Sequence, residues 1–339
     1  MKVDELRAKL FQLEKHDIIR LAVEFYKLVP KAKKEDYNLD VLINTPEVKT
    51  TKPSATEAAV SFEEMETEVN TFITNAKEQH YLYPNKVISK KERATWRFKV
   101  KAWYKELVNP KSNGLNMPKK AKICEDLYNL LCESCHFQYF SADDTFGSVG
   151  VPQTDFFESV LQLMDRTEGE TSLLTRGLDM AINNPISPNN LHSWLMQAFV
   201  NNLSTVQIKN DAIEKVEKMI AGNKPPISTN TKKGAYPDDS MKNYYREKKN
   251  NNLAEMGFRL YASLFEYDEA IQFYNKYTIQ NSDEVKLYIL IRLLFEDEQK
   301  DYIQSLLESA KASGKEMRNA LNNLLASIQK NDKLPEYIH

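Results

Sequence analysis

The chain has 339 residues, of which 42% are hydrophobic and 28% are charged, a composition typical of a folded protein. Its 48 acidic and 46 basic residues nearly cancel, which excludes a general electrostatic attraction to nucleic acid or to a membrane surface. It contains only nine glycines, far fewer than the usual frequency of about 7% would give. Because sheets joined by tight turns need glycine, this scarcity favours an all-α, multi-helical fold.

Residues 1–45 predict an N-terminal helical hairpin. Leu6, Leu10 and Leu13 repeat at helical spacing, and a second apolar series runs from Ile18 to Leu28 before Pro30 ends it. Charged residues interrupt the N-terminal segment where a signal peptide needs a continuous apolar stretch, so we expect no export signal. No apolar run approaches the roughly 20 residues that a membrane span needs. We therefore expect a cytoplasmic protein with no membrane partner.

Residues 46–60 are polar and predict a linker, and residues 61–221 predict a central helical domain. Within that domain, Ser187 and Pro188 supply an N-cap and a first-turn proline to a predicted helix. Its apolar residues repeat at intervals of three and four and predict a buried stripe of Leu191, Trp194, Leu195, Ala198 and Phe199.

The segment 86–122 departs from the overall charge balance, with twelve Lys or Arg residues against two acidic ones. A helix here places Trp96, Val100, Trp103 and Leu107 on one face, which predicts a core stripe. The neighbouring face carries five candidate residues for binding an anionic ligand: Lys90, Arg93, Arg97, Lys101 and Lys105. Such a face can contact phosphates without reading a base sequence. Pairing with the acidic remainder of the chain is the other interpretation.

Residues 132–136 read CESCH, the spacing by which c-type haem is attached. On a helix, however, Cys124, Leu131 and Cys135 share one apolar side, and Cys132 lies at its edge. Cysteine in that position is a small core residue. A zinc site would need a second pair of ligands, which the histidines do not supply at ligand spacing. We expect no cofactor and no metal.

No catalytic constellation is readable in the chain. It contains neither a phosphate-binding loop nor a dinucleotide-binding fingerprint. Asp143 and Asp144 are adjacent carboxylates, which we interpret as turn or cap residues because no strand precedes them. An enzyme is therefore the less favoured interpretation.

The clearest break in the apolar pattern covers residues 222–252, which contain two adjacent prolines and many polar residues. The segment has no apolar period, and it predicts a linker or a long surface loop. Residues 253–339 then predict a separate C-terminal helical domain.

In residues 253–328 a first predicted helix carries Tyr261 and Leu264, Tyr267 lies at the turn, and a second helix carries Ala270, Ile271 and Tyr274. This pattern resembles a degenerate tetratricopeptide repeat. Ala270 contributes most to the resemblance, because the paired helices of that family cross closely where a bulky side chain would not fit. Gly257 stands one position before the place of the family's small residue, and Ser282 stands where its closing proline is common. The resemblance implies stacked helices, solenoid-like in arrangement, that bind partner segments.

Together these observations favour a non-catalytic helical interaction or scaffold module that binds a protein or peptide partner. The alternative is a nucleic-acid-associated protein that uses the basic helix within residues 86–122. The third interpretation is an enzyme whose helical active site leaves no motif in the sequence.

Overall fold

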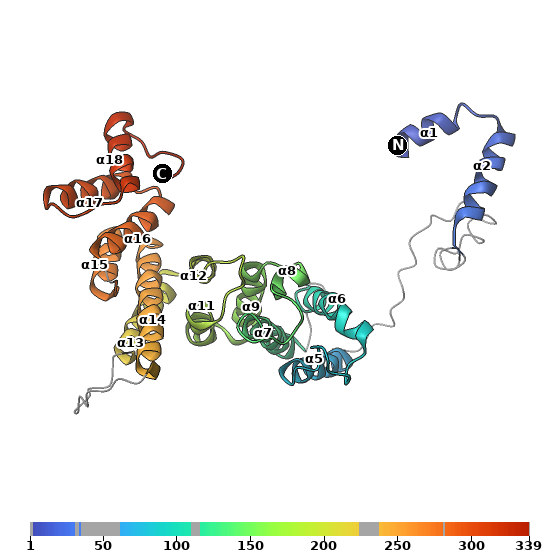
Figure 1. Ribbon diagram of the computed structural model, residues 1–339, viewed down its shortest axis with the longest axis horizontal. Helices are drawn as coiled ribbons and strands as arrows, with labels where there is room; N and C mark the ends of the chain where they lie inside the picture. Colours follow the sequence, from blue (N-terminus) through green and yellow to red (C-terminus); the bar gives the residue numbers. More distant parts are fainter. Residues whose placement is uncertain are drawn as a thin grey trace. The chain divides into compact units, whose positions relative to one another are not determined.

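The structure is a computed structural model that describes residues 3–30, 34, 62–109, 116–223, 237–280 and 282–338. Every regular element in these ranges is a helix, so the predicted all-α fold is confirmed (Figure 1). No described helix combines the length and the apolarity that crossing a membrane requires. Contacts along the chain divide it into two units, Met1–Met65 and Glu66–His339.

The first unit contains α1 (Val3–Leu10) and α2 (Lys15–Leu28), which lie where the N-terminal hairpin was expected. The chain leaves α2 in an extended conformation at Val29, directly before Pro30, as the proline predicts. No residue of α2 is buried, so its apolar series forms no hairpin core. The predicted linker, residues 46–60, lies outside the described residues.

The second unit begins within α5 (Phe62–Lys77) and continues through α6 (Lys90–Leu107) and α7 (Met117–Glu133). The short α8 (Thr145–Val149) and α9 (Gln153–Glu168) follow. Helix α7 packs along α9, and α6 contacts both α7 and α8 (Figure 1). The predicted core stripe of α6 is confirmed, because its four residues Trp96, Val100, Trp103 and Leu107 are all buried.

An aromatic cluster packs α5 and α6 against the segment that follows α7. The ring of Phe140 stacks on Trp96 with centroids 4.0 Å apart and on Phe72 at 5.6 Å. Trp103 meets Phe72 edge to face at 5.3 Å. Offset and edge-to-face contacts of this kind add to the free energy gained by burying the rings. The buried face of α6 is therefore fixed by packing of its tryptophan rings, and this packing positions its exposed face.

The middle of the unit contains α10 (Glu170–Ser172), the π-helical turn η2 (Leu173–Gly177), α11 (Leu178–Asn183), α12 (His192–Asn201) and α13 (Val206–Gly222). The predicted start of α12 at Ser187 is wrong. The Ser187 backbone N–H donates to Gln153 and its hydroxyl to Asp144, which holds the chain in a turn up to Leu191. The prediction that Leu191 and Trp194 belong to a buried stripe is also wrong, because their side chains are 47% and 52% exposed.

The prediction of a linker over residues 222–252 is wrong for residues 237–252, which form the first part of α14 (Pro237–Ala262). This part lacks an apolar stripe because carboxamides make its contacts. Asn251 Oδ1 accepts from the N–H of Ile279 at 2.7 Å, and Asn252 Nδ2 donates to the carbonyl of Ile182 at 3.2 Å. Helix α14 packs on α11, α12, α13 and α15, so the central and C-terminal parts belong to one contact unit.

The remaining helices are α15 (Tyr267–Tyr277), α16 (Asp283–Glu296), α17 (Lys300–Ala312) and α18 (Asn319–Asn331). They share one apolar core with the second half of α14. Ala270 and Tyr274 are buried in it. Helix α14 packs closely on α15. The repeat family and the solenoid arrangement stay predictions.

Gly257 permits the close approach of α14 to α15. A Cβ atom added there would lie 2.0 Å from the ring of Phe273. We expect Gly257→Ala to lower the free energy of unfolding by about 1–2 kcal/mol, because displacing a packed ring costs more than the gain in helix propensity. Urea unfolding followed by circular dichroism measures this loss.

Gly222→Ala is the matched control, because a Cβ atom at that position would meet nothing within 4 Å. A shorter side chain at the obstructing position, Phe273→Leu, should restore part of the stability of Gly257→Ala. If Gly257→Ala is as stable as the wild type, the two helices do not approach as closely as described.

Candidate functional site

The five candidate anion-binding residues of α6 do not form one free surface. Arg93 Nη1 donates to the carbonyls of Leu82 at 3.1 Å and Asn85 at 2.7 Å, which ties the preceding segment to the helix. Lys101 Nζ donates to the carbonyl of Gly150 at 3.2 Å. These two side chains therefore have structural contacts within the protein.

Lys90, Arg97 and Lys105 are exposed on α6 and form no ion pair within the described part of the chain. The Arg97 guanidinium lies 4.9 Å from the ring centre of its neighbour Phe98. In contrast, basic residues of α7 are paired, as between Lys122 and Asp126 at 2.8 Å. Basic charges of α7 are thus neutralised by carboxylates of the protein, whereas Lys90, Arg97 and Lys105 of α6 are exposed to solvent. Anion binding by α6 stays a prediction.

A cavity of about 650 Å³, which we call the α8–α12 groove, lies between α8, the start of α9 and α12. This volume is within the range of about 300–1,000 Å³ that is usual for ligand sites. Its lining combines apolar and polar side chains, including Asp144, Val151, Pro152, Gln153, Asn190 and Trp194.

Asp144 lies at the polar end of the groove and is the N-cap of α8, which confirms its interpretation as a cap residue. Its carboxylate accepts from the N–H of Gly147 at 2.9 Å and from Ser187 and Asn189 at 2.9 and 2.8 Å. Burial acts to raise the pKa of Asp144, but these three hydrogen bonds outweigh it and hold the pKa below its ordinary value. The carboxylate stays ionised at neutral pH.

Gln153 holds the loop before α12 against α9. Its Oε1 accepts from the N–H of Ser187 at 2.8 Å and from Asn190 Nδ2 at 3.2 Å. Its Nε2 donates to the carbonyl of Pro185 at 2.9 Å and to Cys132 Sγ at 3.3 Å. The side chain is only 2% exposed, so these bonds satisfy a carboxamide that would otherwise be costly to bury. The groove is consequently preformed.

Trp194 lines the groove from α12 with half of its surface in solvent. The other two tryptophans, Trp96 and Trp103, are 5% and 7% exposed and belong to the aromatic cluster. At the α8 end, Lys101 reaches the carbonyl of Gly150, a lining residue. The groove thus combines an exposed aromatic ring, apolar Val151 and Pro152, and a fixed carboxylate.

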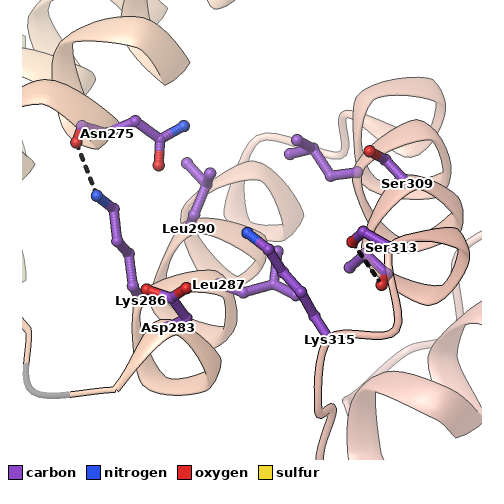
Figure 2. Close-up of a pocket in the computed structure, with 10 residues that line it drawn as sticks. Asn275, Asp283, Lys286, Leu287, Leu290, Ser309, Ser313 and Lys315 are labelled. Atoms are coloured by element: carbon purple, nitrogen blue, oxygen red, sulfur yellow. Dashed lines mark hydrogen bonds between the residues drawn. The ribbon is translucent and has the colours of Figure 1, made fainter.

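A second cavity, of about 210 Å³, lies between α15, α16 and α17 (Figure 2). Lys286 Nζ donates to the carbonyl of Asn275 at 2.7 Å and bridges its edge. Figure 2 shows Ser309 and Ser313 on the facing side and Lys315 between the two helices. No aromatic ring lines this cavity among the described residues, which makes it the weaker candidate for holding a partner side chain.

The cysteines of CESCH and Cys124 lie in a core rather than in an open site. Cys124 and Cys132 are buried, whereas Cys135 is partly exposed. The prediction that Cys132 lies at the edge of the core and Cys135 within it is wrong, because α7 ends at Glu133 and Cys135 has left the helix. Burial raises the pKa of Cys132 to about 12 and raises that of Cys124 further. Neither thiol is a nucleophile at neutral pH.

Comparisons of the chain with family models, with curated proteins and with solved structures find no match. Function therefore has to be argued from the geometry of this molecule. The sequence pattern did not point to Gln153 or to the exposure of Trp194.

Proposed function

We propose that the protein is a non-catalytic interaction module, and that the α8–α12 groove binds a segment of a protein partner. The observation that supports this most is the exposed Trp194 beside a preformed, largely apolar groove. Tryptophan is enriched among the few interface residues that carry most of the binding energy. A groove that is already hydrogen-bonded into shape loses little conformational entropy when a partner binds.

The chemistry of the groove defines the expected partner segment. Val151, Pro152 and the Trp194 ring favour an aliphatic or aromatic anchor side chain. Asp144 has its carboxylate oxygens engaged, so it contributes a fixed negative charge. Asp155, in the first turn of α9, adds a second carboxylate to the lining. We therefore expect an apolar anchor followed by a basic residue.

Selection from a phage-displayed peptide library, with the full chain as bait, tests this proposal. Selected peptides should share an apolar anchor next to Lys or Arg. Their binding should shift tryptophan emission to shorter wavelength, because Trp194 is the one exposed tryptophan. Trp194→Ala should weaken binding about 30-fold, the effect of losing roughly 2 kcal/mol at a central interface residue.

Phe137→Ala is the matched control, because Phe137 is 62% exposed and does not line the groove. Its peptide affinity should equal that of the wild type. Peptides that bind Trp194→Ala as tightly as the wild type would contradict the proposal.

Nucleic acid is the second candidate partner, favoured by the exposed charges of Lys90, Arg97 and Lys105 on α6, which form no ion pair with any residue that the structure describes. Binding of this kind would weaken steeply as salt rises. Replacing the three residues with glutamine should then flatten the salt dependence. For either partner we propose a cytoplasmic location, which the free thiols Cys124, Cys132 and Cys135 support.

A further inference from the structure

A third cavity, of about 270 Å³, lies where α14 meets the loop between α11 and α12. Helix α14 contributes Tyr245, Lys248, Lys249 and Asn252, whose spacing places them on one face of the helix. A helix face turned toward a neighbouring element is usually apolar. This one presents two cations, a phenol and a carboxamide. We call this space the α14 cavity.

The opposite wall adds two histidines, His136 after α7 and His192 at the start of α12. No aspartate or glutamate lines the cavity among the described residues. Lys248 and Lys249 have no ion pair or hydrogen bond within the described ranges. Two lysine ammonium groups and two imidazoles therefore line a cavity to which the described residues contribute no carboxylate.

The pKa of His192 is lowered by its surroundings in the cavity. Burial, and then the positive charge of Lys248, lower the pKa of His192, and His136 acts in the same direction. A hydrogen bond to the backbone of Ala181 opposes them. The Nδ1 atom of His192 is buried and has no hydrogen-bond partner among the residues placed by the structure. The imidazole is therefore neutral at neutral pH.

We propose that the α14 cavity binds the phosphate group of a small phosphate monoester that carries a planar ring. Lys248 and Lys249 supply the charges that a phosphate dianion needs. Tyr245, 57% exposed on the same face of α14, offers a ring on which a planar group stacks. This site is separate from the α8–α12 groove, and its test does not depend on the proposed function.

The apolar and amide parts of the wall fit the same ligand. Ile182 at the end of α11 and Pro185 and Ile186 in the following loop line the cavity and would exclude water from one side of a bound ring. Asn252 is fixed by its bond to the Ile182 carbonyl, which anchors α14 to the end of α11. The volume is slightly below that of sites for drug-sized ligands, which limits the ligand to a mononucleotide or smaller.

Isothermal titration calorimetry of the full chain tests the site, with inorganic phosphate, adenosine monophosphate and adenosine as probes. We expect the nucleotide to bind more tightly than inorganic phosphate, and adenosine to give no measurable binding. Lys248→Gln with Lys249→Gln should weaken nucleotide binding about 10-fold or more, because hydrogen bonds to charged groups are the strong ones. Tyr245→Leu should weaken the nucleotide about fivefold and leave inorganic phosphate unchanged.

Lys330→Gln with Lys333→Gln is the matched control, since it removes the same charge from exposed positions outside the cavity. Glutamine is a helix former comparable to lysine, so circular dichroism should be unchanged in both double variants. Equal weakening by the two double variants would overturn the proposal in favour of unspecific attraction. Failure of the wild type to bind either phosphate probe would overturn it directly.

The pH dependence provides an independent readout. A bound phosphate raises the pKa of His192, so His192 takes up a proton on binding, and this favours binding as the pH falls from about 7.5 to about 6. Protonation of the phosphate dianion near pH 6 acts in the opposite direction in both proteins, so the contribution of His192 is the difference between the pH profiles of the wild type and of His192→Ala. A pH profile that is identical in His192→Ala would contradict the role of this wall.

Discussion

Phe140→Ala should lower the free energy of unfolding by about 3–5 kcal/mol, the usual cost of removing a buried aromatic ring. Phe140 is 1% exposed and stacks on both Trp96 and Phe72, so its removal leaves a cavity between α6 and α5. Collapse of the site is restricted because Trp103 already fills the other side of Phe72. Urea unfolding followed by tryptophan fluorescence measures the loss.

Phe137→Ala provides the comparison three residues away, because Phe137 is 62% exposed. Its stability should change by less than about 0.5 kcal/mol. Phe140→Leu should fall between the two, since leucine refills part of the space. Equal stabilities of Phe140→Ala and Phe137→Ala would mean that the cluster does not hold α5 and α6 together.

Arg176→Met should cost about 3 kcal/mol, because it leaves the buried carboxylate of Glu125 without its closest cation. Arg176 Nη2 lies 3.2 Å from Glu125 and 2.7 Å from Glu168, and it projects from the π-helical turn η2. Glu125 is only 6% exposed. The guanidinium itself is partly solvated, so we expect the lower end of the range measured for breaking buried pairs.

The cost of Arg176→Met should depend on pH. Burial raises the pKa of Glu125 even in the wild type, where Arg176 opposes the shift. Without Arg176 the pKa rises further, so the folded state binds a proton more readily than the unfolded chain does. Stability is then lost as the pH rises and regained as it falls toward about 5. Thermal unfolding at several pH values measures this.

The double variant Glu125→Gln with Arg176→Met separates the charge effect from packing. It should recover most of the lost stability and lose the pH dependence, because position 125 then carries no charge that can titrate. Lys218→Met is the surface control, since its pair with Glu214 is largely exposed and contributes little. A double variant as unstable as Arg176→Met alone would show that the charge of Glu125 is not the cause.

The sequence alone predicts the buried face of a helix where its apolar residues repeat at helical spacing and that face packs in the core. The Trp96 to Leu107 stripe of α6 is the example. Local periodicity predicts which face of a helix is buried, because the hydrophobic effect acts on every turn of that face.

Prediction from the sequence was less successful where polar contacts over long separations replace apolar burial. The first part of α14, residues 237–252, has no apolar stripe, and Asn251 and Asn252 at its end bond to backbone groups of distant segments. The turn before α12 depends on Asp144, which is 43 residues from Ser187 along the chain. The lining of each cavity comes from separate helices, so no single stretch of sequence contains its pattern.

Helix α14 is 26 residues long, which at 1.5 Å per residue makes a continuous rod of about 39 Å. Residues 245–252 form a wall of the α14 cavity, and Arg259 near the other end is hydrogen-bonded to Gln197 of α12 and Glu296 of α16. Because the helix is continuous between these two regions, we expect a change in its tilt at Lys248 to alter the geometry of both Arg259 hydrogen bonds. Slower amide hydrogen exchange in α16 is the signal that we expect when the cavity is filled.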